Sequence, residues 1–204
     1  VVPEVSRKFL HIMVGNMIFA MPFFSDPWVM VWFLTLPITI GLFFLTEYSP
    51  VKIENSVTES GHARGLFFYA LIWTVLIAVF AMIAPAGDPK FYIWIVALAI
   101  VPMVYGDGFA ALIGQKFGRL KYTVFGGEKS VEGSLTMFVI TSVMSVFIWV
   151  VFSSIGCTMP ELNIVYILTI SAVATVCEAL SYGGVDNWTV PAITSILYYL
   201  VAIL

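Results

Sequence analysis

The sequence predicts an all-α fold, a polytopic integral membrane bundle of about seven transmembrane helices. The prediction rests on composition, on the length of the apolar runs and on the placement of the basic residues. Of the 204 residues, 61% are hydrophobic and only 10% are charged, and the mean hydropathy of +1.02 is far above that of an ordinary soluble domain. Because no fixed-period repeat or low-complexity linker divides the chain, we expect residues 1–204 to form one helical domain.

Seven apolar runs are candidates for spanning helices, for which a bilayer requires about 20 mostly apolar residues. The first, fourth and last are short, and the fourth can continue as a helix past Gly106. In chain order the runs are 9–24, 28–48, 65–84, 91–105, 131–153, 162–180 and 188–204.

The basic residues gather on one side of this seven-helix arrangement. The N-terminus and the connections at 49–64, 106–130 and 181–187 share that side and hold eight of the nine Lys and Arg residues, whereas the opposite side holds only Lys90. Lys and Arg are enriched in cytoplasmic loops, so we expect the first side to face the cytoplasm. An arrangement with one span fewer would distribute these basic residues over both sides of the membrane, so the charge pattern supports seven spans.

Composition also weighs against other classes of protein. The net charge of −3 is too small to indicate a nucleic-acid partner. Cys157 and Cys177 are expected toward opposite faces of the bilayer, so we interpret both as packing residues and not as a disulfide.

The segment that follows the fourth run combines an acid with small residues. If the helix continues, a rotation of about 100° per residue places Asp107, Ala110, Gly114 and Gly118 on one stripe. A ligand or another backbone can approach such a stripe closely. The alternative is a face for helix packing, since small residues four apart are common in membrane helices.

The basic loop after this stripe has the features of an anion site. Lys129 adjoins an expected helix start at Ser130, where free N–H groups and the helix dipole favour phosphate. It is not a Walker A loop, because Glu128 stands where that motif requires Gly and we expect no strand before it. A basic loop that merely obeys the charge rule is the alternative, but it does not explain Asp107 and Glu132.

Two more polar clusters are expected on the same face. Glu178 lies near the end of one run, and Asp186 with Asn187 leads into the last. Acids at membrane depth are costly and mark functional sites, although Asp186 is equally suited to cap a helix that has Pro191 in its first turn.

The N-terminal segment carries a further polar face. The residues Glu4, Arg7, Lys8 and His11 share one side of a helix by their spacing. A snorkelling interfacial anchor is the alternative interpretation, but an anchor does not need an imidazole one turn deeper.

Carboxylates together with phosphates are how proteins usually hold Mg²⁺. The candidate metal ligands are Asp107, Glu132, Glu178 and Asp186. No Cys or His spacing suits zinc, and no Ser-His-Asp arrangement is evident. The residues alone therefore predict a site for Mg²⁺ and a nucleotide or polyphosphate at the cytoplasmic face.

The motifs taken together resemble a known family. The stripe from Asp107 to Gly118, followed by Lys129-Ser130-x-Glu132-Gly133-Ser134, resembles the CTP-binding signature of the membrane polyprenol kinases, which include dolichol kinase, phytol kinase and the CTP-dependent diacylglycerol kinases. Residues 7–11 and 178–191 also resemble that family's pattern. The resemblance implies transfer of the γ-phosphoryl group of CTP to a lipid alcohol in the bilayer.

The resemblance also implies roles for individual residues. Mg²⁺ is expected at Asp107, Glu132, Glu178 and Asp186, and Asp186 is also the candidate for orienting or deprotonating the alcohol. The catalytic candidates are Asp107, Lys129 and Asp186. The residues expected to contact the nucleotide are Arg7, His11, Ala110, Gly114, Lys116, Gly118, Arg119, Lys121, Gly126, Gly127, Lys129, Ser130, Gly133 and Asn187.

Alternative functions remain open from the sequence. An integral-membrane cytidylyltransferase that makes a CDP-lipid would use similar carboxylates and Mg²⁺. A small transporter would place its charges at mid-depth, often in two related halves, and a scaffold for anionic lipid leaves the acids unexplained. The acceptor is not fixed by the sequence, although a short bundle without an added domain favours a phytol-like or undecaprenol-like alcohol.

Overall fold

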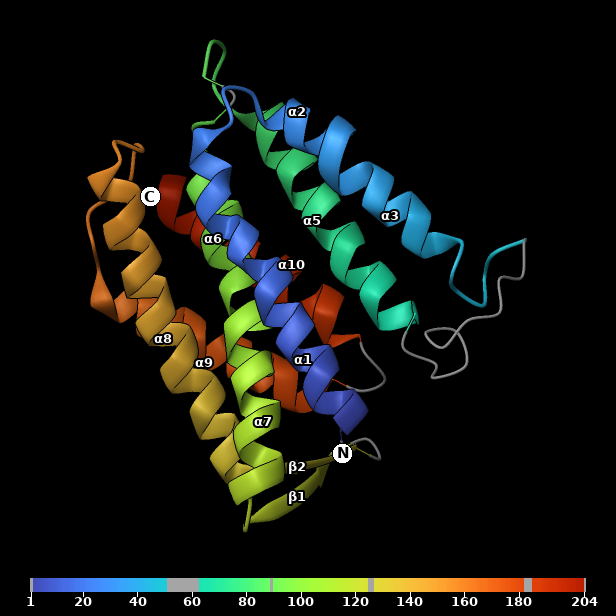
Figure 1. Ribbon diagram of the computed structural model, residues 1–204. Coiled ribbons are helices and arrows are strands. Elements are labelled where there is room, and N and C mark those ends of the chain that lie inside the picture. The colour runs from blue at the N-terminus through green and yellow to red at the C-terminus, as the bar shows by residue number, and fades with distance from the viewer. Residues whose placement is uncertain (1, 51–62, 89, 125–126, 182–184, 204) are drawn as a thin grey trace.

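The computed structural model describes residues 2–50, 63–88, 90–124, 127–181 and 185–203 (Figure 1). The helical segments are α1 (Val2–Gly15), η1 (Asn16–Phe23), α2 (Pro27–Met30), η2 (Val31–Thr35), α3 (Leu36–Phe43), α5 (Ala63–Ile83), α6 (Ile93–Val101), η3 (Pro102–Gly106), α7 (Asp107–Phe117), α8 (Val131–Ser154), α9 (Ile164–Leu180) and α10 (Asp186–Ile203). One hairpin, β1 (Lys121–Val124) and β2 (Gly127–Ser130), lies between α7 and α8.

The predominantly helical fold is confirmed, and each of the seven predicted runs coincides with helical segments. Among the described residues, three helices are long and apolar enough to cross a membrane, namely Arg64–Ile83, Ile93–Phe117 and Val131–Ser154. The second of these joins α6, η3 and α7, so the fourth run does continue past Gly106. Proline has no N–H to donate, and the helix widens into a π-helical turn where Pro102 begins η3.

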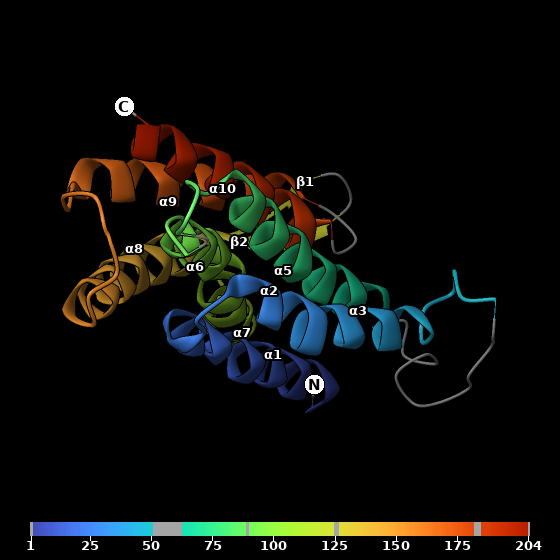
Figure 2. The ribbon, with the colours of Figure 1, turned by 90° about the horizontal axis from the view of Figure 1, so that it is seen from above.

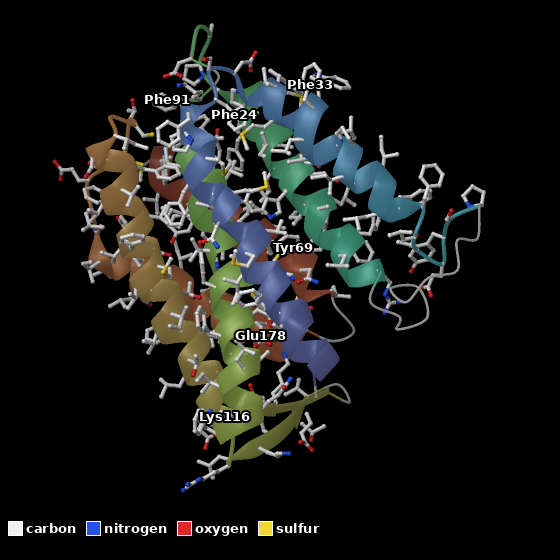
Figure 3. The ribbon with its side chains drawn as sticks, in the orientation of Figure 1. Phe24, Phe33, Tyr69, Phe91, Lys116 and Glu178 are labelled. Atoms are coloured by element: carbon white, nitrogen blue, oxygen red, sulfur yellow. The ribbon has the colours of Figure 1, made fainter. Side chains whose placement is uncertain are left out.

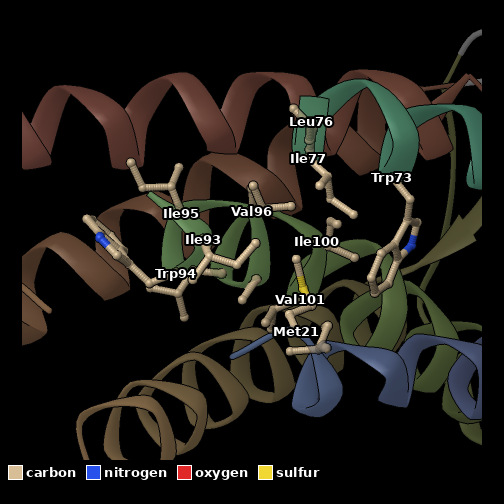
Figure 4. Packing of buried hydrophobic residues seen from close by; sticks show 14 of the residues in the cluster. Met21, Trp73, Leu76, Ile77, Ile93, Trp94, Ile95, Val96, Ile100 and Val101 are labelled. Carbon is tan, nitrogen blue, oxygen red and sulfur yellow. The ribbon is translucent and has the colours of Figure 1, made fainter. Parts of the chain in front are cut away.

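The continuous helix of α6, η3 and α7 forms the centre of the bundle (Figure 2). Every residue of α6 is buried, as expected for a helix that is apolar on all sides. Side chains of α5 and η1, including Trp73, Ile77 and Met21, pack against it (Figure 4). The polar residues that follow α6 on the same helix are therefore carried on the most enclosed element of the fold.

The hairpin corrects the all-α expectation. The strands are antiparallel, with Tyr122 opposite Lys129 and Val124 opposite Gly127. Tyr, Thr and Val favour strands, which the apolar-run analysis did not weigh. Lys129 consequently lies on β2, one residue before the N-cap Ser130, and the expectation that no strand precedes this helix was wrong. Glu128 still excludes a Walker A loop.

A close approach of α1 to the central helix gives a test of the packing. A Cβ on Gly15 would lie 2.0 Å from Cγ1 of the buried Val104. We expect Gly15→Ala to lower the free energy of unfolding by about 1–3 kcal/mol, the usual cost of overpacking, measured by thermal unfolding in detergent. Gly41→Ala is the control, because no atom lies within 4 Å of its Cβ position. Equal unfolding temperatures for Gly15→Ala and wild type would contradict this packing.

Candidate functional site

Most of the predicted site residues that the structure describes lie at one end of the bundle. The start of α1, the outer half of α7, the hairpin and the first turn of α8 meet there (Figure 1). Glu178 and Lys116 lie toward this end in Figure 3. Residues far apart in the sequence are thus brought to one face, as the charge pattern predicted.

The first pair of charges joins α1 to the central helix. Lys8 Nζ lies 2.5 Å from Oδ2 of Asp107, the first residue of α7, and the two side chains are only 12% and 10% exposed. Gly108 allows α1 to come this close, because a Cβ there would lie 2.7 Å from Ile12 Cγ1. A buried carboxylate is costly unless it is paired, so this contact stabilises the fold.

The second pair joins the hairpin to the end of α9. Lys129 Nζ lies 2.5 Å from Oε1 of Glu178, and it also donates to the Glu178 backbone carbonyl. Carbonyls in the last turn of a helix attract cations through the helix dipole. Lys129 and Glu178 were expected to bind phosphate and metal respectively, and in the structure they bind each other.

Asp186 completes the cluster from α10. Its carboxylate is close enough to Asp107, Lys8 and Lys129 to interact with all three electrostatically. The backbone carbonyl of Val185 accepts the first bond of the helix, from Thr189 N at 2.9 Å. Val185 therefore occupies the N-cap position and Asp186 the first turn, where the helix dipole favours a carboxylate.

Asn187 has a structural contact. Its side-chain amide is buried and donates to the Gly65 carbonyl at 3.3 Å, which ties α10 to α5. Contact of Asn187 with a nucleotide remains a prediction.

The carboxylate of Glu132 accepts hydrogen bonds from the backbone that follows α7. Its Oε1 accepts from Arg119 N at 3.0 Å and from Leu120 N at 3.2 Å, so the carboxylate fixes the segment after α7 against the first turn of α8. A metal ion at Glu132 would have to share this carboxylate with two backbone donors. Its role as a metal ligand remains a prediction.

The stripe of small residues contacts the start of α8. A Cβ on Gly133 would lie 3.2 Å from the Ala110 carbonyl oxygen, and one on Gly118 would lie 2.7 Å from Ser130 Oγ. Ser130 Oγ accepts from Gly133 N at 3.1 Å. This arrangement matches the helix-packing alternative for Ala110, Gly114 and Gly118, and contact with a nucleotide remains a prediction.

The other basic candidates form an exposed rim. Lys116 lies 5.1 Å from the centre of the Phe117 ring, Arg119 is exposed, and Lys121 pairs with Glu128 across the hairpin. Gly127 pairs with Val124 in the hairpin. Gly126 and the side chain of Arg7 lie outside the described residues.

His11 lies deeper than the rim, as its position one turn after Lys8 predicted. It is 6% exposed, and its ring meets Tyr69 edge-on, with the ring centres 3.7 Å apart. The Tyr69 hydroxyl donates to the His11 carbonyl at 3.0 Å. Lys8 itself was missed as a site residue, although its position on the same helix face as His11 was a usable signal.

The cluster offers carboxylates for a shared metal site. Within the part of the chain that the structure describes, no three Asp, Glu, His or Cys residues form a metal site of their own. Mg²⁺ is commonly bound by one or two carboxylates with phosphates and water. The neighbouring carboxylates of Asp107 and Asp186 fit that requirement.

Comparison with known proteins shows which family shares this sequence. The chain is 32% identical over 197 residues to phytol kinase of Synechocystis sp., a match that covers 92% of this chain and 75% of the relative. The chain belongs to the phytol kinase family. The resemblance to the membrane polyprenol kinases is thereby confirmed.

Plant members of the phytol kinase family are also similar. Phytol kinase 1, chloroplastic, of Arabidopsis thaliana is 30% identical, with 97% of this chain and 66% of the relative covered. Probable phytol kinase, chloroplastic, of Triticum aestivum is 29% identical, with 97% and 67% covered. No family model and no solved structure matches the chain. The similarity to the phytol kinases thus extends over the elements that carry both ion pairs.

The buried Lys8–Asp107 pair can be tested through stability. Removing one partner of a buried pair costs about 3–5 kcal/mol, because the other charge is left unpaired. We expect Lys8→Met to lower the free energy of unfolding by this amount and Lys8→Met/Asp107→Asn to lower it by less, measured by denaturant titration in mixed micelles. Lys121→Met, which breaks an exposed pair, should cost less than about 1 kcal/mol. A double variant no more stable than Lys8→Met would contradict the pairing.

Proposed function

We propose that the chain is a lipid kinase that transfers the γ-phosphoryl group of CTP to the hydroxyl of a phytol-type alcohol. Membership of the phytol kinase family supports the reaction class. The observation that carries the proposal is the pairing of Lys8 with Asp107 and of Lys129 with Glu178 at one end of the bundle. A site that binds both phosphates and a cation needs lysines and carboxylates together, and here they neutralise each other.

In the proposed reaction, the paired lysines and carboxylates exchange each other for the nucleotide and its cation. When the nucleotide enters, Lys129 turns from Glu178 to the phosphates, and the rim residues Lys116, Arg119 and Lys121 assist. Mg²⁺, held at Asp107 and Asp186 with Glu178 and Glu132 as further expected ligands, would neutralise charge on the β- and γ-phosphates. Positioning and charge neutralisation supply most of the catalysis in phosphoryl transfer.

The chemical step is a direct displacement at the γ-phosphorus. The oxygen of the alcohol forms a bond to the γ-phosphorus, the bond from that phosphorus to the bridging β,γ-oxygen breaks, and CDP leaves. Asp186 accepts the hydroxyl proton, or orients the hydroxyl as it is lost. The products are CDP and the monophosphate ester of the alcohol.

The proposal includes an orientation in the membrane. We infer seven spans, namely the three long helices, the three shorter apolar helices His11–Phe23, Pro27–Phe43 and Ile164–Leu180, and α10. We also infer a site that faces the cytoplasm. The eight basic residues expected on that side of the chain support this orientation. The nucleotide then arrives from the cytosol, and the hydroxyl of the acceptor lies at headgroup level, where helix ends can meet it.

The central residues can be tested by substitution. We expect Asp107→Asn and Lys129→Ala each to reduce lipid phosphorylation by more than about 100-fold, the scale of losing a charged transition-state contact, while the protein still folds. Lys90→Ala and Glu161→Gln are matched controls for charge removal, because both residues lie in connections expected on the opposite side. Near-normal turnover in either central variant would remove that residue from the mechanism.

The nucleotide donor and the reaction products distinguish a kinase from a cytidylyltransferase. We expect labelled CTP to support turnover better than ATP, and α-labelled CTP to yield CDP with an unlabelled lipid phosphate. Thin-layer analysis of both phases measures this. A labelled CDP-lipid with release of pyrophosphate would instead establish a cytidylyltransferase, and equal use of ATP would contradict the CTP preference.

A further inference from the structure

A cavity lies apart from the two ion pairs, between α1, α3 and α5. Its volume is about 280 Å³, and its walls are mostly apolar side chains. Val14 from α1, Ile38 from α3 and Leu66 from α5 line it, and His11 and Tyr69 contribute polar groups. We call it the α1–α3–α5 groove.

The groove reaches the outer surface of the bundle. Val14 and Ile38 both line it and are 48% and 45% exposed. In a protein that spans a membrane, these exposed apolar side chains face lipid. A hydrocarbon chain can therefore pass between the groove and the bilayer without crossing water.

The polar residues of the groove connect it to the site. His11 lies one helical turn from Lys8, whose ammonium group contacts Asp107. The Asp107 carboxylate is also close enough to interact electrostatically with His11 and with the Tyr69 hydroxyl. A chain that occupies the groove with its polar end at His11 thus presents that end to Asp107.

We propose that the α1–α3–α5 groove binds the branched isoprenoid chain of the acceptor alcohol and directs its hydroxyl toward Asp107 and the neighbouring carboxylate of Asp186. This inference rests on the proposed lipid kinase function and adds the site of the lipid substrate. The volume is near the lower end of the range of roughly 300–1,000 Å³ for small-molecule pockets. The groove accordingly holds the part of the chain next to the hydroxyl, and the remainder extends into lipid.

The groove acts through shape and position. Lipid tails are as apolar as the lining side chains, so moving a chain from the bilayer into the groove gains little from the hydrophobic effect. Methyl branches that fit against Val14, Ile38 and Leu66 distinguish an isoprenoid chain from a straight one. We therefore expect the groove to determine which alcohol is phosphorylated and to leave nucleotide binding unchanged.

Two tryptophan substitutions on α3 test the groove. Ile38→Trp fills it, whereas Ile40→Trp, two residues away and 49% exposed, adds the same bulk on a side chain that does not line the cavity. We expect Ile38→Trp to raise the KM for a 20-carbon branched alcohol by about 10-fold or more, with an unchanged KM for CTP. Equal KM values for the alcohol in both variants would overturn the proposal.

A second pair of variants tests the groove independently, in case Ile38→Trp impairs folding. Val14→Phe narrows the same groove from α1, and Met13→Phe, whose parent side chain is 53% exposed, is its matched control. The same rise in KM for the alcohol is expected for Val14→Phe alone.

Photolabelling separates failure of the groove from failure of the kinase. An isoprenoid alcohol with a diazirine on its chain should label peptides of α1, α3 and α5 without any nucleotide, and Ile38→Trp should abolish that labelling while Ile40→Trp retains it. Labelling of other helices would overturn the groove even if the enzyme is active. If the groove is labelled but no alcohol is phosphorylated with any nucleotide, the groove stands and the kinase proposal fails.

Discussion

The ion pair between Lys8 and Asp107 is the interaction on which the rest of the site depends. Asp107 sits on the most enclosed helix of the bundle, and a carboxylate there needs a cation. The cation comes from α1, which can approach only because Gly15 and Gly108 leave room for Val104 and Ile12. The same approach carries His11 against Tyr69 and so forms one wall of the groove. Packing, charge neutralisation and the α1–α3–α5 groove thus all depend on the close approach of α1 to the central helix.

The second ion pair shows how the charges of the proposed phosphate site are balanced within the protein. Lys8 pairs with Asp107 and Lys129 pairs with Glu178, so the two ion pairs are neutral, and the carboxylate of Asp186 gives the set a formal charge of −1. In the proposed function, a nucleotide with its cation would bring both signs of charge together, so that Lys129 could leave Glu178 for the phosphates while the cation pairs with the carboxylates. These lysines and carboxylates are thus already removed from water in the folded protein, before the proposed substrate binds.

Much of this could be predicted from the sequence, for physical reasons that differ between residues. The apolar runs fixed the helices because a bilayer demands about 20 apolar residues in succession, and the side of each acid followed from the helix order. The partners of those acids could not be predicted, since Lys8 and Asp107 lie 99 positions apart and no local rule links them. Glu132 was interpreted as a metal ligand, but its backbone contacts at residues 119 and 120 arise from a turn that apolar patterning does not encode. The hairpin was missed because strands of four residues lack a clear period.

The hairpin also determines which charged side chain contacts the end of α9. Successive side chains on a strand face opposite sides, so β2 directs Lys129 to Glu178 and sends its neighbour Glu128 to Lys121. A slip of one residue between β1 and β2 would exchange the two. Glu128 would then meet Glu178, and two like charges would stand where a cation is needed. The register of the four residue pairs therefore keeps Lys129, the residue proposed to bind phosphate, in contact with Glu178.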